Sequence, residues 1–442
     1  MKSKQWDSFI ILMLAIAILF AMSLFPEFSL LSLKVKKINL VEDIQSAPID
    51  SLFAADTTTK KVDTLVVKKE QPIAKRKGSR EIEDFGLNNL NFFFESLINS
   101  RSEPVRIAFF GDSYIEGDIL VSPFRDTLQT IFGGLGVGYM PITSEVNMFR
   151  TSIQHTYSNW EAFSIVGSRS ELHPLGMPGL SFKPLEGNEV QYKPAHRKPP
   201  FRLGKIFYRS NSDCSLTLSL NDSVRSTYLL GSCDSIKQFQ LPTKNFSQVG
   251  FSFSEFDRLT LFGAALEDSV GISVDNFSMR SNPGLGLNMI SDEMFLQFNR
   301  LRNYKLIILQ YGLNVVNEND STGYIGYQEK MTSLINRLKN LFPKTSFLLL
   351  SVSDRSVKKG NQMVTMPGIF VLRDVQRKIA FRSKIAFWDL FEAMGGENSM
   401  VKYTEAIPPL GAKDYTHLTF RGGRKIAKRF ADALLRAKKR HS

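Results

Sequence analysis

The sequence predicts an α/β fold in which a parallel β-sheet is covered by helices on both faces. A β-rich domain interrupts this fold, and a membrane helix precedes it. Three observations predict this arrangement. Buried-strand patterns alternate with helical patterns over residues 81–132 and again after residue 284. Short alternating runs, separated by Asn, Asp, Ser and Gly, fill residues 133–275. An uncharged, apolar run spans residues 9–25.

The N-terminal run predicts an uncleaved signal anchor within residues 1–33. Lys2 and Lys4 precede the run, as the positive-inside rule requires, although further lysines follow it. We expect the rest of the chain to be exported, on the periplasmic face of a bacterial inner membrane. A cleaved signal peptide is the alternative and gives the same compartment. Residues 34–80, with eleven basic and six acidic residues and no sustained period, are expected to form a flexible basic linker.

Composition excludes several classes of protein. The 442 residues are 43% hydrophobic and 22% charged, which excludes wholesale disorder and a polytopic membrane protein. The net charge of +13 is concentrated in residues 34–80 and 421–442, so the folded body carries no excess and nucleic acid is not an expected partner. Two cysteines cannot form a disulfide-dense scaffold or a Cys-rich zinc site.

The first part of the α/β domain is expected over residues 81–139. Apolar residues at helical spacing predict a helix over 81–100. The run 105–110 is short and apolar, ends at a Gly-Asp-Ser turn and is typical of a buried parallel strand. Residues 119–132 then form the following helix.

The inserted domain is expected over residues 140–270. Its short strands and polar turns are most simply a β-sandwich or jelly roll. The runs that predict these strands, the last of which leads back into the α/β domain, are 202–208, 215–220, 226–230, 250–253, 258–262 and 271–277.

Residues 271–442 are expected to complete the α/β domain. Helical patterns cover 291–301, 327–341, 371–382 and 419–438, and strand patterns cover 305–310, 346–351 and 385–390. Because these patterns alternate, the strands are expected to join the strand at 105–110 in one parallel sheet.

Four polar residues are candidates for chemistry. Ser113 follows the first strand, Asn314 follows the strand at 305–310, and Asp414 and His417 precede the last helix. Ligands of an open parallel sheet bind beyond the carboxyl ends of its strands, where Ser113 and Asn314 lie. A serine hydroxyl needs a neighbouring base, which His417 can supply while Asp414 orients the imidazole. Asn314 can donate to an oxyanion. Each residue alone has a structural reading as a turn or surface residue, so their joint order carries the interpretation.

These residues make the chain resemble the SGNH hydrolases, also called GDSL esterases. Gly111-Asp112-Ser113 is similar to the first block of that family, which implies Ser113 as nucleophile and, through its N–H, as an oxyanion donor. Asp414 and His417 match the last block. The resemblance covers residues 105–135 and 270–435, and implies a three-layer, flavodoxin-like domain.

The two middle blocks match less well. Asn314 fits the Gly-x-Asn-Asp block as an oxyanion donor, but Val315 replaces the usual Asp, which puts the local turn in doubt. For the glycine that completes the oxyanion hole, Gly284 is the first choice, with Ser281 as a rival.

Within the family, the chain looks similar to exported O-acetylesterases that act on peptidoglycan or other polysaccharides and carry an inserted β-sandwich resembling a carbohydrate-binding module. This resemblance implies removal of O-acetyl groups from a cell-envelope glycan. One alternative is an O-acetyltransferase that works with a membrane-bound O-acyltransferase. Another is a non-catalytic glycan-binding protein. No cofactor and no metal are expected, because the sequence shows no cluster of metal-ligand residues.

Cys214 and Cys233 flank two strand patterns around a polar turn at 221–223. A hairpin that pairs Cys214 with Cys233 would bring them within disulfide range. We expect a disulfide in an exported domain, with two free buried thiols as the alternative.

Overall fold

The computed structural model describes residues 28–30, 33–35 and 80–442, apart from 197, 222–223, 243, 319–322 and 442. The expected anchor at 9–25 and nearly all of the expected linker lie outside these residues. Two short strands, β1 (Phe28–Leu30) and β2 (Leu33–Val35), pair antiparallel in the first of two compact units. Among the described residues, no helix has the length and apolar character needed to cross a membrane.

The second unit contains a five-stranded sheet in the order β13-β3-β14-β15-β18, in which every neighbouring pair is parallel. This confirms the predicted α/β architecture. Its strands are β3 (Pro104–Gly111), β13 (Gly271–Ser278), β14 (Tyr304–Gln310), β15 (Ser346–Leu350) and β18 (Ala386–Trp388). The register aligns their carboxyl ends in one row, Ser278, Gly111, Gln310, Leu350 and Trp388. The loops that follow the strands therefore leave the sheet side by side.

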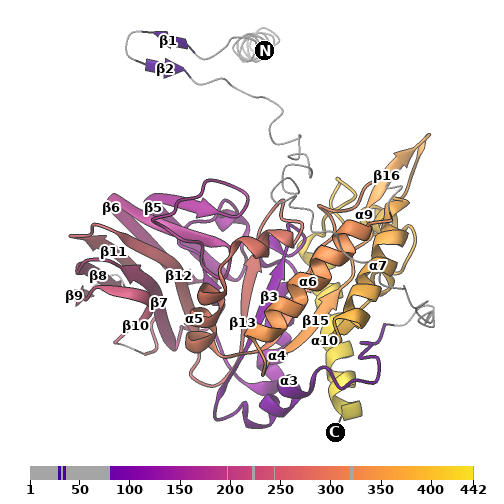
Figure 1. Ribbon diagram of the computed structural model, residues 1–442, viewed down its shortest axis with the longest axis horizontal. Helices are drawn as coiled ribbons and strands as arrows, with labels where there is room; N and C mark the ends of the chain where they lie inside the picture. Colours follow the sequence, from indigo (N-terminus) through magenta and orange to yellow (C-terminus); the bar gives the residue numbers. More distant parts are fainter. Residues whose placement is uncertain are drawn as a thin grey trace, which may run out of the picture. The chain divides into compact units, whose positions relative to one another are not determined.

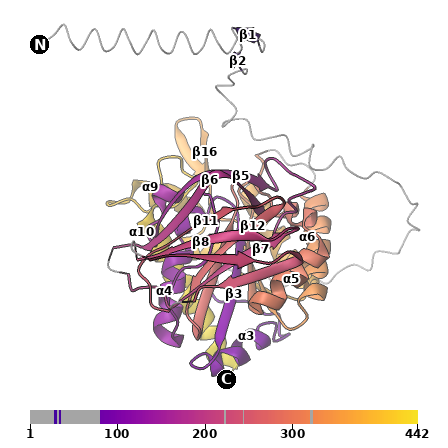
Figure 2. The same cartoon turned by 90° about the vertical axis from the view of Figure 1, so that its left-hand side faces the viewer.

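Helices cover both faces of this sheet. On one face, α4 (Val121–Phe132) packs against α10 (Phe420–His441). On the other face, α6 (Ile325–Leu341) packs against α7 (Gly368–Arg382), and α5 (Asp292–Arg302) packs against α6. Figure 2 shows α4 and α10 on one side of β3 and α6 on the other. Strands β3, β14 and β15 are mostly apolar because this arrangement buries them on both faces.

The expected helix over 81–100 is wrong in its first half. Glu83 instead forms an isolated antiparallel β-bridge with Phe387 of β18, and Phe85 and Asn88 adopt left-handed backbone angles. A residue with positive φ cannot continue a right-handed helix. The helix α3 therefore spans only Asn91–Ser96, followed by one 3₁₀ turn.

In the α/β domain, one hairpin and two short helices have no counterpart in the sequence predictions. They are the hairpin of β16 (Ser356–Lys359) and β17 (Gln362–Thr365) and the short helices α8 (Leu390–Met394) and α9 (Ser399–Glu405). All three follow carboxyl ends of the parallel sheet, and the hairpin projects from the molecule (Figure 1).

The inserted domain is a nine-stranded antiparallel sheet with its own apolar core. Its strands are β4 (Gly138–Met140), β5 (Ile153–Ser164), β6 (Leu180–Pro194), β7 (Leu203–Ser210), β8 (Cys214–Leu220), β9 (Val224–Leu230), β10 (Cys233–Gln240), β11 (Val249–Ser254) and β12 (Leu259–Glu267). Where the sequence predicted a β-sandwich, the structure has all nine strands hydrogen-bonded in one continuous sheet. One edge of β6 pairs with β5 throughout, while its other edge pairs first with β12 and then with β11. The long strand β6 thus joins both halves of the domain.

The hairpin β8–β9 forms, but the predicted pairing of its cysteines is wrong. Cys214 faces Leu230, and Leu220 faces Val224, so the strands are three residues out of the expected register. Cys233 begins the next strand, β10, where it faces Ser210 of β7. Both cysteines are buried and free in the structure.

A buried cluster of charges joins the two domains. Glu267, at the end of β12, contacts Arg106 of β3 at 2.9 Å, Arg302 of α5 at 2.9 Å and Lys205 of β7 at 3.2 Å. Arg302 also contacts Asp275 of β13 at 2.7 Å. Burial alone would raise the pKa of Glu267, but Arg302 and Arg106 hold that pKa below its ordinary value. The two domains therefore meet through paired ions in addition to an apolar interface, in which Phe207 and Phe262 of the inserted sheet pack against Phe298 of α5.

Replacing Arg302 should destabilise the whole second unit. Arg302→Met leaves Asp275 buried without its guanidinium partner, and breaking such a buried pair typically costs about 3–5 kcal/mol. Arg300→Met, two residues away on the same helix and exposed, should change the stability by less than about 0.5 kcal/mol. Urea unfolding of both variants measures the difference. Equal stability of the two variants would contradict a structural role for this cluster.

Candidate active site

The turn after β3 exposes Ser113 at the carboxyl end of the sheet. Gly111 precedes it, and a Cβ at this position would lie 2.7 Å from the Ile115 side chain and 2.9 Å from the carbonyl oxygen of Gln310. Only glycine fits there, since no real Cβ tolerates such distances. The turn is held from β13 by Asn276, whose Nδ2 donates to the carbonyl of Ile115 at 3.1 Å.

The structure brings three of the sequence-predicted side chains together. Ser113 Oγ lies 2.9 Å from His417 Nε2, although 304 residues separate them. On the other side of the imidazole, His417 Nδ1 lies 2.6 Å from Asp414 Oδ2. With the imidazole neutral, a proton on Nδ1 is bound by Asp414, and Nε2 is left to accept the hydroxyl proton of Ser113. The site opens to solvent, because the His417 and Asp414 side chains are 37% and 49% exposed.

Two glycines at the start of α10 bring the His417 loop to Ser113. A Cβ on Gly422 would lie 2.0 Å from the carbonyl oxygen of Leu410, and one on Gly423 would lie 2.2 Å from that of Ile119. Ile119 belongs to the segment that follows the Ser113 turn. The helix can therefore approach both backbones only because these residues have no side chain.

Hydrogen bonds fix the ionised form of Asp414. Partial burial would raise the pKa of its carboxyl, but the His417 ring and the amide N–H groups of His417 and Thr416 hold that pKa well below its ordinary value. Asp414 thus remains a carboxylate at acidic pH and stabilises an imidazolium beside it.

Asn314 follows β14 and has an unused donor. Its Nδ2 is buried, and no hydrogen-bond partner for it exists among the described residues. The Ser113 N–H likewise has no acceptor in the described part of the chain. The turn at Asn314 forms despite the departure at Val315, since the N–H of Val315 donates to the carbonyl of Gly312 at 3.0 Å. The Val315 side chain is buried in the core.

The structure argues against Gly284 as an oxyanion donor. Its N–H already donates to Asn282 Oδ1 at 2.9 Å. Glycine is needed here for packing, because a Cβ would lie 2.8 Å from the ring of Tyr311. Ser281, the rival position, adopts a φ of 61° and is exposed, and its N–H has no acceptor among the described residues. The resemblance favoured Gly284 because the corresponding block of the family carries a glycine.

Asp112 lies beneath Ser113 and is wholly buried. Its Oδ1 accepts the N–H of Tyr114 at 3.0 Å, and the amides of Leu313 and Gly312 face the same carboxyl. Burial raises the pKa of Asp112 to about 6 against the opposing effect of these amides and of His417. The carboxyl thus lies between the Ser113 turn and the Asn314 turn, and its Oδ2 is buried with no hydrogen-bond partner among the described residues.

The raised pKa predicts a pH effect on stability. A carboxyl whose pKa is higher in the folded protein favours folding at low pH, and this contribution is lost as the pH rises from about 4 through about 6. The unfolding free energy of the natural protein should therefore contain a loss of about 2–3 kcal/mol between pH 4 and pH 7.5 that Asp112→Asn lacks. Denaturant unfolding of both proteins at the two pH values tests this. Parallel pH profiles would contradict it.

Sequence reasoning missed Arg355. This residue follows β15 at the same edge of the sheet as Ser113 and Asn314, and its half-buried guanidinium donates to the carbonyl of Leu313 at 3.3 Å. A signal was present, because a charged residue five positions after a buried strand end lies where ligands bind in such sheets.

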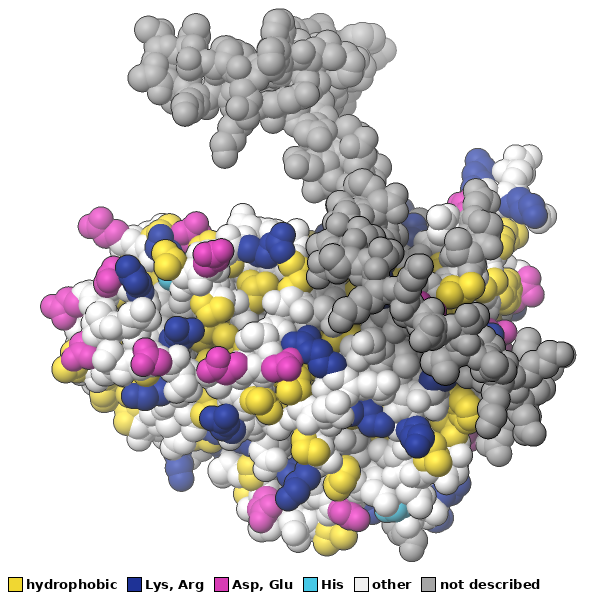
Figure 3. Space-filling model, in the orientation of Figure 1, with side chains coloured by type: hydrophobic (Ala, Val, Ile, Leu, Met, Phe, Trp, Pro, Cys, Tyr) yellow, Lys and Arg dark blue, Asp and Glu magenta, His cyan; other side chains and the backbone are white. Residues whose placement is uncertain are grey.

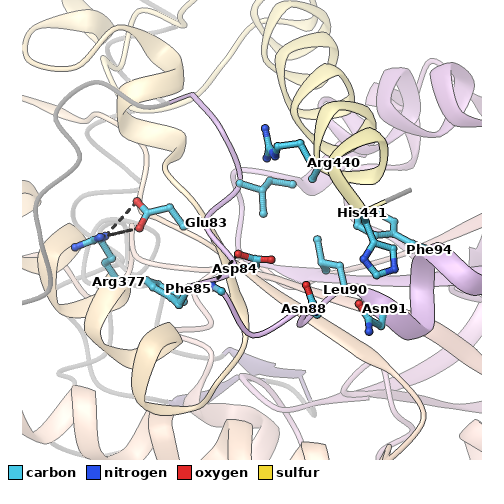
Figure 4. Close-up of a pocket in the computed structure, with 13 residues that line it drawn as sticks. Glu83, Asp84, Phe85, Asn88, Leu90, Asn91, Phe94, Arg377, Arg440 and His441 are labelled. Atoms are coloured by element: carbon cyan, nitrogen blue, oxygen red, sulfur yellow. Dashed lines mark hydrogen bonds and ion pairs between the residues drawn. The ribbon is translucent and has the colours of Figure 1, made fainter.

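A cavity of about 520 Å³ lies away from these residues (Figure 4). It is formed by the segment 82–94, Arg377 and the end of α10, including His441. Helix α10 begins beside His417 and its far end lines the cavity. Because the helix has 22 residues, its two ends lie about 33 Å apart, which separates the cavity from the Ser113 site. At the margin of the cavity, Arg377 Nη2 lies 2.7 Å from Glu83 Oε2.

Comparisons with known proteins give a structural match. No protein-family model and no curated protein matches the chain. A peptidoglycan O-acetylesterase of known structure matches with a TM-score of 0.65 and 18% identity, over 81% of this chain and 97% of that chain.

Two further solved structures are more distant. An acetyl xylan esterase matches at TM-score 0.29 with 17% identity, over 37% of this chain and 81% of its own. A family two carbohydrate esterase from Clostridium thermocellum matches at 0.27 with 7% identity, over 60% and 98%. These two scores are too low to support a structural argument. The chain thus has the fold of a peptidoglycan O-acetylesterase, in agreement with the resemblance of its motifs to SGNH/GDSL hydrolases.

Proposed function

We propose that the protein is a serine esterase that removes O-acetyl groups from a cell-envelope glycan. The hydrogen-bonded series Ser113, His417 and Asp414 is the observation that carries this proposal. A nucleophile, a base and an orienting carboxylate in this order can perform acyl transfer. The fold shared with a peptidoglycan O-acetylesterase supports an acetylated glycan as substrate.

The proposed reaction proceeds through an acetyl-enzyme. Ser113 Oγ attacks the acetyl carbonyl while His417 Nε2 takes the hydroxyl proton, and Asp414 stabilises the resulting imidazolium. The negative charge on the carbonyl oxygen is met by Asn314 Nδ2 and the N–H of Ser113, with the N–H of Ser281 as a further donor. His417 then returns the proton to the departing sugar hydroxyl. Water, activated by His417, releases acetate and restores Ser113.

Location and partners are part of the proposal and rest on the sequence. The run at 9–25 supports an exported protein anchored in the inner membrane. If a sugar hydroxyl rather than water accepts the acetyl group, the same site becomes an O-acetyltransferase, for which a membrane-bound O-acyltransferase would supply acetyl groups. Acetate release measured with and without a sugar acceptor distinguishes the two reactions.

Variants of the three residues test the mechanism. Ser113→Ala and His417→Ala should abolish acetate release, because the nucleophile or its base is lost. Asp414→Asn should lower kcat by up to about 10⁴-fold, since the imidazole loses its orientation and its counter-charge. The assay is acetate release from O-acetylated peptidoglycan, with thermal unfolding to show that each variant folds. Near-normal turnover by a folded Ser113→Ala variant would refute the proposed serine-hydrolase mechanism.

The oxyanion donor has a separate signature. Asn314→Ala should lower kcat by about 10²–10³-fold with little change in KM, because the donor acts on charge that develops in the transition state. Asn288→Ala, at an exposed position, is the matched control and should retain normal kcat. A purely raised KM for Asn314→Ala would show instead that this side chain binds the ground state.

A further inference from the structure

The backbone of Arg355 is clamped between the two halves of the candidate active site. Its carbonyl accepts the N–H of Met366 at 2.9 Å. The next residue, Ser356, donates its N–H to the carbonyl of Tyr415 at 3.0 Å, and Tyr415 lies directly after Asp414. The start of the projecting hairpin is thereby joined to the loop that carries Asp414 and His417.

The side chain of Arg355 extends to the other half of the site. Its Nη1 donates to the carbonyl of Leu313, the residue before Asn314. The guanidinium therefore lies within one residue of the proposed oxyanion donor, while its own backbone is tied to the proposed base. None of its other nitrogens is both buried and without a partner, so the remaining N–H groups reach solvent.

Arg355 has no acidic partner in the described part of the chain. Three other half-buried arginines of the same domain contact a carboxylate at 3.0 Å or less, namely Arg337 with Asp292, Arg373 with Asp389, and Arg377 with Glu83. Arg429 also donates to a carbonyl, that of Ala393, but it lies on α10 and donates to the Tyr403 hydroxyl as well. A guanidinium that is partly desolvated beside a neutral carbonyl has unused capacity for an anion. Its fork of donors fits the two oxygens of a carboxylate.

The surroundings add positive charge. Lys358 and Lys359 are exposed on β16, and Lys413 is exposed directly before Asp414. Figure 3 shows Lys or Arg side chains at the tip of the projecting hairpin. These cations would draw an anionic chain toward the site without fixing its register, because mobile surface lysines act mainly through the long-range field.

We propose that Arg355 binds a carboxylate carried by the substrate sugar and so selects acetylated glycans that contain acidic sugars. This inference rests on the proposed function and adds the chemical class of its substrate. A phosphate ester presents similar oxygens, but one guanidinium with no fixed second cation matches the single charge of a carboxylate better. Arg355 is thus assigned to specificity and not to the acyl transfer itself.

Matched small substrates test this selection. The probes are O-acetylated methyl glucuronoside, its methyl ester, O-acetylated methyl glucoside 6-phosphate, and 4-nitrophenyl acetate as a small neutral ester. The natural protein should prefer the free acid to the methyl ester by about 10–100-fold in kcat/KM, as expected for a hydrogen-bonded charge pair. Arg355→Met should abolish that preference through KM, and Arg355→Lys should retain part of it.

The controls separate binding from a merely structural role. Arg101→Met also removes a guanidinium that donates to a carbonyl, that of Ile131 at 3.1 Å, but before the start of β3 at the opposite edge of the sheet. It should leave the preference unchanged. On 4-nitrophenyl acetate, which has no carboxylate to bind, the loss in kcat/KM caused by Arg355→Met should be about 10–100-fold smaller than its loss on the free acid.

Each contrary result has one meaning. Equal losses on all four esters would show that Arg355 only supports the Asn314 turn, and equal rates of the natural protein on acid and methyl ester would refute selection by charge. Preference for the phosphate probe over the acid would show that Arg355 binds a phosphate and would refute the proposed carboxylate. If the natural protein hydrolyses 4-nitrophenyl acetate yet ignores the sugar charge, the esterase stands and this inference fails. If the natural protein hydrolyses none of these esters, both the proposed esterase function and the selection by Arg355 are refuted.

Discussion

The parallel register of the central sheet is the constraint on which the rest of the structure depends. Because Ser278, Gly111 and Gln310 end their strands in one row, the turns that follow them leave the sheet at the same level. Ser113 and Asn314 occupy two of these turns. A slip of one residue along any strand would turn its side chains to the other face and separate the site residues. The chemistry of the site is therefore set by strand pairing before any polar contact forms.

Polar contacts then tie neighbouring turns to one another. Buried Asp112 faces the amides of the Asn314 turn, and Arg355 donates to the carbonyl of Leu313 in that same turn. Ser356 binds the backbone of Tyr415, which lies between Asp414 and His417. Loops that would otherwise move independently thus share hydrogen bonds across the site. These hydrogen bonds join the loops that carry Asn314, Asp414 and His417, and Ser113 Oγ lies 2.9 Å from His417 Nε2.

Buried ion pairs, in addition to the chain connections, hold the inserted domain against the α/β domain. Glu267 ends the strand that leads out of this domain, and it meets Arg106 and Arg302 of the α/β domain in a buried cluster. Paired buried ions add little net stability, but they are strongly directional, and losing one partner leaves a costly unpaired charge. The cluster therefore defines one orientation of the two domains and disfavours others.

The sequence by itself determined the alternation of strands and helices, and hence the parallel sheet with Ser113 and Asn314 just after two of its strands. These features follow from local apolar periodicity, which a single sequence displays. Tertiary structure alone decided the features that depend on distant partners. The segment at 81–90 forms turns instead of a helix, with Glu83 bonded to Phe387 of β18. Cys214 does not face Cys233 because the register of the hairpin differs by three residues from the expected one. The hydrogen bond from the Gly284 N–H to Asn282 and the one from Arg355 to the Leu313 carbonyl were not predicted, because contacts between and within loops are not encoded in apolar periodicity.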